Sequence, residues 1–483
     1  MIQKTNDFDL YGIIETNDKP KKFFQNQNLI NFKKTWYLDN LNIQNKKPDI
    51  EYLKIKEKQY GINIWQLAYA ERYFLDFNKY HKFSFEEILM FFEQEFRFFE
   101  KILDEIKPEF VIIRLPDFHH IKLFCEICKK KNIHLLILSR SKFSLNHFMI
   151  SQDPHKIDLT EKNPKSFVKT ISDIKKLHTG GRKNQLNVIS SNRPSLSKML
   201  RRNALGSIFK FFMARGKNND RDRFLERGRS RIKVISKTLP ILLKAKYRDF
   251  FIDNHLTKSV PMNKKFVYFP IHLEPEEDIL TGAPYYTNQI EVIKNIAKSL
   301  PIEYLLYAKE HPIQGKLYWR PISFYKQLLE LPNVVVIHPQ LKSLELIEKC
   351  SLVCTIGGSS GLEAAFFKKP SIIFGKPFYS KLTSTFIVDQ LDDLPSLIKK
   401  AINSKFNENE LIDLVNDEMN NCFEFYPYEL LDKFNPFYGT MFSNVEITEE
   451  QMENFLDKNK EVFKKLTFEH VKKMTILKEI HKS

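Results

Sequence analysis

A glycine-rich segment stands out in a chain that has only 14 glycines among 483 residues. It reads CTIGGSSGLEAA and contains Gly357, Gly358, Ser359, Ser360 and Gly361. We expect a strand before the glycines and a helix directly after them. Glycines let the backbone approach a ligand closely, and N–H groups at a helix start favour an anion. The segment therefore predicts a phosphate or diphosphate site, although an ordinary strand-to-helix turn with a serine cap shows the same pattern.

Further groups suited to phosphate and ribose chemistry are expected beside this loop. Glu363 lies near the start of the same helix, where a carboxylate can accept hydrogen bonds from ribose hydroxyls. In YAKEHP, Lys309 and His311 leave the end of another strand. Lysine supplies positive charge, and a histidine with a reference pKa of ~6.5 can donate to a leaving phosphate or protonate it. His338 also precedes a proline, and we interpret that second pair as a strand end.

A polar loop follows the strand expected over KFVYFPI. His272, Glu274 and Glu276 offer one imidazole and two carboxylates, and Glu274 is a candidate catalytic residue together with His311. Asn288 and Gln289 come at the start of the next helix, where they are expected to line the same cleft as His272 and Glu276. A proline-bounded polar loop without a catalytic role is the alternative.

In the first part of the chain, the candidate site residues follow the short strand in PEFVIIRLPDF. Arg114 and Asp117 come at its carboxyl end, and Asp117 is the candidate catalytic base. An ion pair between these two side chains is the competing interpretation. Helical spacing over His119–Lys131 and an apolar run over Ile133–Ser139 complete a strand-helix-strand unit, which favours a parallel sheet. Ligands bind beyond the carboxyl ends of such strands.

The elements that must position the glycine loop alternate regularly after residue 263. Strands are expected over KFVYFPI, EYLLYAK, NVVVIHP, SLVCTI and PSIIF, with helices between them. This series of β-α units predicts a Rossmann-like domain. Beyond Tyr379 the pattern thins, and Thr448–His481 is typical of one long amphipathic helix.

The whole chain is too long for one ordinary core and divides into four parts. We expect a Rossmann-like domain over 1–162, a basic linker or helical insertion over 163–263, a second Rossmann-like domain over 264–440, and a helical segment over 441–483. The hydrophobic content of 42% and aromatic content of 13% are ample for packed interiors, which excludes a disordered protein.

The net charge of +17 is concentrated between Ser197 and Phe250, where sixteen Lys or Arg stand against four Asp or Glu. Such a stretch fits phosphate-rich partners, namely anionic lipid head groups, a lipid-linked diphosphate acceptor or RNA. A protein that coats nucleic acid more often spreads its basic residues over the folded surface, so no nucleic-acid partner is expected. A solvated helical connector is the alternative.

The five cysteines do not form a disulfide framework. Cys125 and Cys128 make one C-x-x-C pair without a second pair at zinc spacing, which is typical of a packed helix face, and we expect no metal. The opening MIQKTNDFDLYG lacks the apolar run of a signal peptide, and no run of 18 apolar residues occurs. A cytoplasmic protein is therefore expected, at most peripheral on the inner face of the cell membrane.

Several of these segments together resemble the capsule polysaccharide biosynthesis family, which is related to the capsular Kdo transferases. They are FVYFPIHLEPE, APYYTNQIEVIKNIAKSLP, YAKEHP, NVVVIHP, GGSSGLEA and PSIIFG. The likeness is dense over 266–379 and looser at KPEFVIIRLPDF and LLILSRSKF. It implies an α/β protein with a GT-B fold, in which two Rossmann-like domains face each other across a cleft. The acceptor side would lie on 1–162 and the donor nucleotide on 264–440.

The family resemblance also implies that no metal or cofactor is needed, because the helix dipole and side-chain donors stabilise the leaving phosphate. A wider similarity is to bacterial sialyltransferases and polymer transferases that pair a His-Pro motif with a later Ser-Ser motif around a CMP phosphate. It implies that His311 contacts or protonates the phosphate and that Ser359 and Ser360 bind it.

Two departures from the related patterns leave the donor sugar open. Lys368 stands where the wider motif often has a glycine, and Glu274 stands before a proline where the Kdo transferases carry glutamine.

The function predicted is a glycosyltransferase that moves a sugar from a nucleotide-activated donor, with CMP-sugars among the candidates. The acceptor would be a capsular or surface polysaccharide or its lipid-linked precursor, with residues 197–250 near an anionic membrane surface. The alternatives are a polyol-phosphate transferase or sugar-nucleotide epimerase on the same fold, and a non-catalytic nucleic-acid-binding protein.

Overall fold

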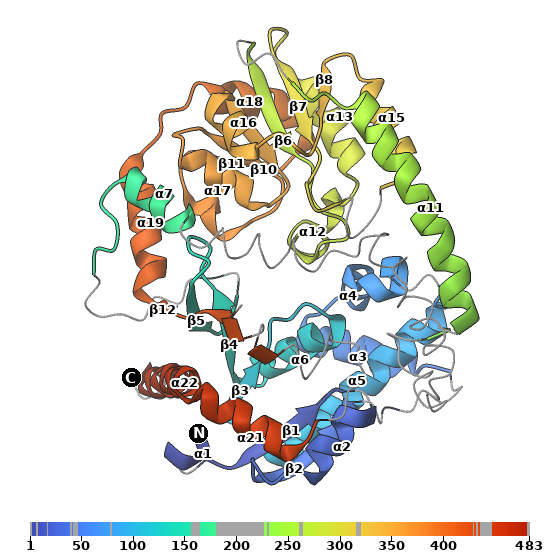
Figure 1. Ribbon diagram of the computed structural model, residues 1–483, viewed down its shortest axis with the longest axis vertical. Helices are drawn as coiled ribbons and strands as arrows, with labels where there is room; N and C mark the ends of the chain where they lie inside the picture. The colour runs from blue at the N-terminus through green and yellow to red at the C-terminus, as the bar shows by residue number, and fades with distance from the viewer. Residues whose placement is uncertain are drawn as a thin grey trace.

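The computed structural model describes the chain except for residues 1, 6–7, 17, 39–40, 42–46, 78–79, 155, 157–164, 180–226, 229–230, 260–263, 315–319, 428, 431–432, 435–446 and 481–483. The part of the basic stretch 197–250 that precedes residue 227 therefore lies outside the described residues. The chain forms an α/β protein with two larger sheets and a long helix, α11 (Arg231–His255), along one side (Figure 1). This confirms the α/β class and its two Rossmann-like halves.

The first of these sheets has four strands in the order β12-β5-β4-β3. β3 (Phe110–Ile113) and β4 (His134–Arg140) run parallel, with α6 (His119–Lys130) between them, as the strand-helix-strand pattern predicts. β5 (His147–Ser151) and β12 (Phe423–Glu424) are antiparallel additions. The chain thus returns to the first sheet well before residue 440.

Several helices and a small parallel sheet precede β3. In chain order the elements are α1 (Ile2–Thr5), β1 (Leu10–Ile14), α2 (Asp18–Asn26), β2 (Phe32–Tyr37), α3 (Ile50–Tyr60), α4 (Ile64–Ala70), a π-helix (Tyr73–Phe77) and α5 (Phe85–Ile106). α5 begins at a capping box, in which Ser84 accepts from the Glu87 N–H and Glu87 accepts from the Ser84 N–H. Its apolar stripe, including the fully buried Phe92 and Phe96, packs into the core of this half.

The second sheet has six parallel strands in the order β11-β10-β9-β6-β7-β8. The strands are β6 (Phe266–Pro270), β7 (Leu305–Lys309), β8 (Val334–Ile337), β9 (Leu352–Thr355), β10 (Ser371–Ile373) and β11 (Thr385–Ile387). With β6 counted as strand 1, the order read from β8 to β11 is 3-2-1-4-5-6, as in dinucleotide-binding Rossmann folds. The strand order reverses between β6 and β9. The first five strands match the predicted segments, whereas β11 lies where the sequence pattern thins.

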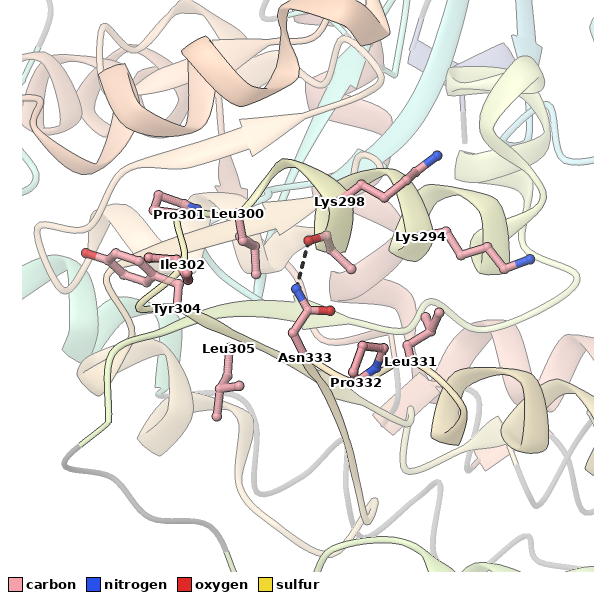
Figure 2. A pocket seen from close by; sticks show the side chains of 11 residues that line it. Lys294, Lys298, Leu300, Pro301, Ile302, Tyr304, Leu305, Leu331, Pro332 and Asn333 are labelled. Atoms are coloured by element: carbon pink, nitrogen blue, oxygen red, sulfur yellow. Dashed lines mark hydrogen bonds between the residues drawn. The ribbon is translucent and has the colours of Figure 1, made fainter.

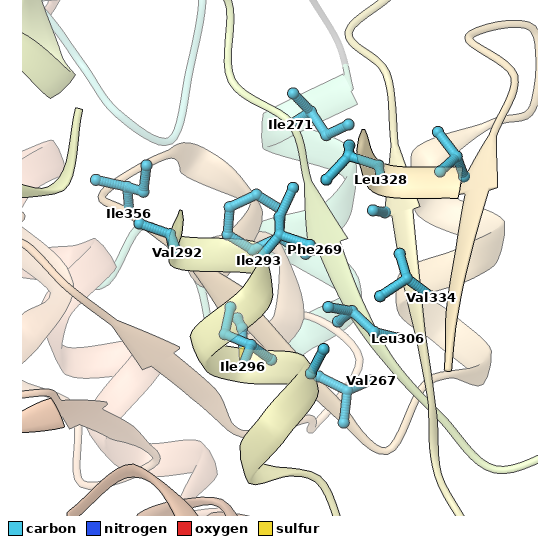
Figure 3. Close-up of a cluster of buried hydrophobic side chains, with 14 of the residues drawn as sticks. Val267, Phe269, Ile271, Val292, Ile293, Ile296, Leu306, Leu328, Val334 and Ile356 are labelled. Atoms are coloured by element: carbon cyan, nitrogen blue, oxygen red, sulfur yellow. The ribbon is translucent and has the colours of Figure 1, made fainter. Parts of the chain in front are cut away.

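Helices cover both faces of the second sheet, which is why its strands are apolar on both sides. The elements are α12 (Glu277–Gly282), a 3-10 turn (Pro284–Tyr286), α13 (Gln289–Ser299), α15 (Ile322–Leu329), α16 (Ser343–Lys349), α17 (Ser359–Ala365), α18 (Leu394–Ile402) and α19 (Glu408–Asn420). Val267 and Phe269 pack with Ile293 of α13 on one face (Figure 3). Phe266 and Tyr268 pack on the other, with residues of α16 and α17.

The C-terminal segment differs from the single helix predicted over Thr448–His481, and that prediction is wrong. The chain forms α21 (Glu449–Lys458) and α22 (Lys460–Ile480) instead. The break falls at Asn459, which leaves helical geometry and whose side-chain amide donates to the Phe455 carbonyl at 2.8 Å. α22 packs on β4 and β5, so this segment completes the first half. Among the described residues, no helix combines the length and apolar content that a bilayer crossing needs.

The loop after β4 joins the two halves. Phe143 is fully buried in one cluster with Leu362, Tyr379 and Met419. Beside it, the Ser141 hydroxyl donates to Glu418 Oε1 at 2.6 Å, and the Lys142 N–H donates to the same oxygen at 2.6 Å. A second contact between the halves is made by α4 against α12.

Candidate functional site

Three loops carrying predicted site residues leave the carboxyl ends of neighbouring strands. The loop with His272 follows β6, the loop with Lys309 and His311 follows β7, and the glycine loop follows β9. β6 pairs with both β7 and β9, so the three loops share one edge of the sheet. We call residues 272–276, 309–314 and 356–363 the switch-point site, because the strand order reverses there and ligands bind at such points in open α/β sheets.

His272 supports the glycine loop from below. Its Nε2 accepts the Ile356 N–H at 3.1 Å and lies 2.9 Å from Thr355 Oγ1. Burial, together with the charges of Arg320 and His311, lowers the pKa of His272 to about 3. The ring is therefore neutral and acts as a fixed acceptor. The sequence predicted a cleft-lining residue, and the structure places the side chain in the interior beneath the loop.

The glycines of the loop have different reasons to be glycine. A Cβ on Gly358 would lie 2.6 Å from His272 Cε1, and a Cβ on Gly361 would lie 2.5 Å from the Tyr379 hydroxyl oxygen. Tyr379 in turn donates to the Gly358 carbonyl at 2.6 Å. At Gly357 a Cβ would meet nothing within 4 Å. Packing thus explains Gly358 and Gly361, and Gly357 is the position where the backbone borders open space.

The serines and Glu363 begin α17. Ser359 is exposed and Ser360 is half-buried, whereas Glu363 is buried. Glu363 Oε1 lies 3.5 Å from Ser359 Oγ and 3.6 Å from His178 Nε2. His178 belongs to α7 (Ile171–Thr179), a helix of the predicted linker. Its spacing gives no sign of this contact, so the sequence analysis missed it.

Lys368 lies two residues beyond the cap of α17, at one of the two positions where this sequence departs from the related patterns. Its φ is 57°, in the left-handed region that favours glycine. The side chain reaches Glu408 of α19 in an ion pair. A lysine thus occupies a backbone position that suits the glycine of the related sequences.

His311 presents one hydrogen-bond donor. Its Nδ1 accepts the Ile313 N–H at 3.2 Å, so in the neutral ring the proton sits on Nε2. Burial and the neighbouring cations Lys309 and Arg320 lower the pKa of His311 to about 4. At neutral pH the ring can donate a hydrogen bond to a phosphate. It can protonate one only if the bound anion raises its pKa.

Lys309 is buried at the end of β7. Its Nζ lies 3.4 Å from the Glu310 carbonyl oxygen, and burial lowers the pKa of Lys309 to about 8 against the opposing effect of Glu310. The ammonium therefore keeps most of its charge at neutral pH. A desolvated cation next to His311 suits an anionic ligand.

Arg320 ties the first two loops together. Its Nε donates to Glu310 Oε2 at 2.9 Å and its Nη1 to Glu274 Oε2 at 2.5 Å, while Nη2 donates to the His272 carbonyl. Glu310 also accepts from the Tyr325 hydroxyl at 2.7 Å. A buried guanidinium with these partners fixes the loops after β6 and β7 relative to each other. Arg320 could not be singled out from the sequence, because nothing in its immediate neighbours separates it from the other basic residues.

Gln289 holds the same region from the start of α13. Its side chain accepts the His272 N–H at 2.7 Å and donates to the His272 carbonyl at 3.1 Å. It also donates to Glu274 Oε1, so both carboxylate oxygens of Glu274 are engaged. The predicted catalytic role of Glu274 stays a prediction. Asn288 is exposed and Glu276 is half-buried at the start of α12.

The candidates of the first half lie apart from this network. Arg114 Nη2 is 3.5 Å from Asp117 Oδ1, and Arg72 donates to the Asp117 carbonyl at 3.0 Å. In the described part of the chain, neither Arg114 nor Asp117 bonds to the switch-point site. The geometry thus forms the ion pair that was the competing interpretation, and the role of Asp117 as a base stays a prediction.

A buried charged histidine sits beside that loop. His119 Nδ1 lies 2.8 Å from Glu71 Oε2, and Nε2 lies 3.0 Å from Glu95 Oε1. Burial alone would lower the pKa of His119, but Glu95 and Glu71 raise it to about 10. Glu95, His119 and His120 are close enough to hold a metal ion. Both ring nitrogens of His119 are nevertheless engaged by carboxylates, which defines an imidazolium ion held by two anions.

Cys125 and Cys128 pack inside the first half. Both are buried free thiols in its core cluster. Burial raises the pKa of Cys125 to about 12, so the thiol is un-ionised at neutral pH. Their environment matches the packed helix face expected for this pair.

A pocket of about 570 Å³ opens at the opposite edge of the second sheet (Figure 2). It lies between the end of α13 and the amino ends of β7 and β8, with Leu300, Leu305 and Asn333 in its lining. The Asn333 amide donates to the Ala297 carbonyl at 2.8 Å. None of the predicted site residues lines this pocket, so it is separate from the switch-point site.

Residues 227–386 match the family described as capsule polysaccharide biosynthesis protein. The match covers this segment of the chain and not the whole of it. It includes all three loops of the switch-point site and about a third of the chain, and it confirms the resemblance noted from the sequence.

Solved structures that resemble the chain include two KpsC transferases of Thermosulfurimonas dismutans. The β-Kdo 2,7 transferase is 15% identical, with 74% of this chain and 87% of that chain covered and a TM-score of 0.33. The β-Kdo 2,4 transferase is 14% identical, with coverages of 64% and 78% and a TM-score of 0.29. A UDP-GlcNAc 2-epimerase of Methanocaldococcus jannaschii is 13% identical, with coverages of 85% and 98% and a TM-score of 0.29. No curated protein matches the chain.

Proposed function

We propose that the protein is a glycosyltransferase that moves a sugar from a nucleotide-activated donor to a capsular or surface polysaccharide or its lipid-linked precursor. The observation that carries this proposal is the meeting of Gly357, Lys309 and His311 at the switch point of a Rossmann-order sheet. An open backbone, a buried cation and a single N–H donor together suit a phosphate group. The family match over the same loops supports the polymer class.

Each residue has a role in this proposal. His311 donates from Nε2 to the leaving phosphate and Lys309 offsets its charge, while Ser359 and Ser360 supply hydroxyl donors. Glu363 binds the ribose, and Asp117 approaches the acceptor as base. Because these groups provide the charge stabilisation, we propose a donor with a nucleoside monophosphate leaving group, as in CMP-sugars, and transfer without a metal ion.

The proposal also places the protein on the cytoplasmic side of the membrane. Residues 197–250 would contact the anionic inner face of the bilayer and keep the site near a lipid-linked acceptor. The excess of positive charge in this stretch supports such contact.

Thermal-shift measurements with CMP, CDP and UDP test the donor site. At least one nucleotide should raise the melting temperature of the wild type, and His311→Ala should remove that shift. His338→Ala is the matched control because His338 also precedes a proline but ends the edge strand β8 and pairs with Asp253 at 3.2 Å. It should keep the shift. The absence of a shift with every nucleotide would contradict the proposal, and product analysis would identify an epimerase by its turnover without an acceptor.

A further inference from the structure

Exposed aromatic side chains gather on α4 and at the start of α5. Trp65 and Tyr69 are one helical turn apart and share a face of α4, with 37% and 67% of their surfaces exposed. Phe85, the first residue of α5, is 55% exposed, and its ring centroid lies 5.4 Å from that of Trp65. We call these three residues the aromatic patch. Clustered exposed apolar side chains are typical of a contact surface.

A basic helix face lies on α11, whose start contacts the segment around Phe85. Lys233, Lys237 and Lys244 are exposed on α11 and recur at helical spacing, followed by the exposed Tyr247. These four side chains therefore form one stripe along α11. The described part of that stripe carries no acidic side chain.

Direct contacts join the start of α11 to the segment that carries Phe85. Lys233 Nζ donates to the Tyr80 carbonyl at 3.3 Å, and Arg227 Nε pairs with Glu87 Oε1 at 2.8 Å. Gly228 packs so closely that a Cβ would lie 2.7 Å from His81 Cβ. The lower end of α11 accordingly lies beside α5 (Figure 1).

The charges around the patch are compatible with an anionic partner. Glu87 is balanced by Arg227 and also lies 2.9 Å from His81 Nε2. Glu86 is an exposed carboxylate beside Phe85, and Lys82 is exposed three residues before Phe85. The cations Lys82, Arg227 and Lys233 therefore outnumber the carboxylates Glu86 and Glu87 in the segments that join α11 to α5.

We propose that the aromatic patch enters the head-group region of an anionic lipid bilayer while the lysine stripe of α11 binds the lipid phosphates. Trp, Tyr and Phe partition into this interfacial zone, and lysines near an anionic surface add attraction. Trp65 and Phe85 pack on each other, which leaves fewer open ring faces for stacked bases and favours lipid over RNA. The inference deepens the membrane contact proposed for residues 197–250 and gives it an apolar anchor in the other half of the chain.

Vesicle sedimentation with the full-length protein tests this surface. The wild type should bind vesicles of phosphatidylcholine mixed with phosphatidylglycerol more tightly than vesicles of phosphatidylcholine alone. Combined Tyr69→Ser and Phe85→Ser should weaken binding to the anionic vesicles by roughly tenfold, and Lys233→Gln, Lys237→Gln and Lys244→Gln together by at least as much. The first pair tests the anchor and the triple variant tests the charge.

Two control variants on α22 match these changes. Phe468→Ser removes an aromatic side chain that is 64% exposed, and Lys464→Gln, Lys465→Gln and Lys472→Gln together remove three exposed lysines. Both controls should bind anionic vesicles as the wild type does. Equal loss in the α22 controls, or wild-type binding by the aromatic variant, would overturn the proposal.

RNA binding and nucleotide binding separate the remaining outcomes. Tight binding to RNA with no binding to anionic vesicles would assign the stripe to nucleic acid and overturn the lipid surface. The thermal shift with nucleotides, measured on the triple lysine variant, should be unchanged because Lys233, Lys237 and Lys244 lie on α11, outside the three loops of the switch-point site. Normal vesicle binding without a thermal shift from any nucleotide would contradict the donor site alone. A normal thermal shift without binding to anionic vesicles would contradict the membrane surface alone.

Discussion

Buried histidines of this protein differ in charge because their partners differ. His272 accepts a backbone N–H and sits near cations, so its ring stays neutral. His311 is neutral for similar reasons, with its proton on Nε2. His119 lies between two carboxylates and is an imidazolium ion. Residue type left open whether His311 donates to a phosphate or protonates it, and only the packed neighbours show that the ligand-free ring is neutral.

The charge on His119 leads to a prediction about stability and pH. Its folded pKa of about 10 lies above the unfolded value of ~6.5, so the native state binds the extra proton between these values. Stability should be fully present below about pH 6.5 and decline as pH rises toward 10. Glu95→Gln removes one of the two carboxylates and should lower the folded pKa of His119. The pH range over which stability declines should therefore become narrower. The decrease in melting temperature between pH 7 and pH 10 should shrink by about 4 °C or more.

Glu93→Gln is the control for that experiment, because Glu93 lies on the same helix but pairs with Arg97 at the surface. Its pH profile should follow the wild type. Lys309, with a folded pKa of about 8, changes stability in the opposite direction over part of this range, and it affects all three proteins equally. Identical profiles for Glu95→Gln and the wild type would contradict the charged state of His119.

At the scale of elements, the glycine loop allows two neighbouring residues to be compared. A Cβ at Gly358 meets His272, which is held by backbone hydrogen bonds, whereas a Cβ at Gly357 meets open space. Gly358→Ala should lower the free energy of unfolding by about 1–3 kcal/mol because of this overlap. Gly357→Ala should leave stability unchanged but weaken nucleotide binding, because its methyl group projects into the space proposed for the phosphate. Chemical denaturation and nucleotide titration of both variants check this.

The two outcomes of the glycine comparison are separable. Equal stability loss in both variants would contradict the described loop geometry. Unchanged nucleotide affinity in a stable Gly357→Ala protein would show that no phosphate binds beside Gly357. It would not contradict the described fold.

How far the elements could be predicted depended on their length and surroundings. Long apolar runs predicted β6, β7 and β9. β11 and β12 have three and two residues and lie beyond Tyr379, where the alternating sequence pattern thins. Glycine clustering located the loop after β9. Its supports, Arg320 and Gln289, come from other segments, and only tertiary packing reveals them.

At the scale of the whole molecule, Glu418 links the two halves. Burial raises the pKa of this carboxyl group, although the Ser141 hydroxyl and the Lys142 N–H oppose the shift. Compared with the unfolded chain, the native state favours the protonated carboxyl group. The stability of the protein should therefore decline as pH rises above the unfolded pKa of ~4.3. Glu418→Gln should leave the melting temperature unchanged or raise it at pH 7. Glu418→Ala should lower the free energy of unfolding by about 1–3 kcal/mol, because buried donors lose their acceptor.

Thermal unfolding at pH 5 and pH 7 measures both effects. Asp417→Asn is the control, since Asp417 is the exposed neighbour on the same helix. A large loss of stability in Glu418→Gln would show that the ionised carboxylate is required at this contact.

β12 gives the chain an unusual order of construction. The polypeptide leaves the first sheet after β5, builds the whole second sheet, and re-enters the first sheet at β12, which pairs antiparallel with β5. The second half is therefore nested inside the first, and the strands on either side of it are adjacent. A tight hairpin could join those two strands directly if the intervening segment were removed. The second half could thus be exchanged between genes as one continuous segment, whereas the first half is encoded in two separate segments.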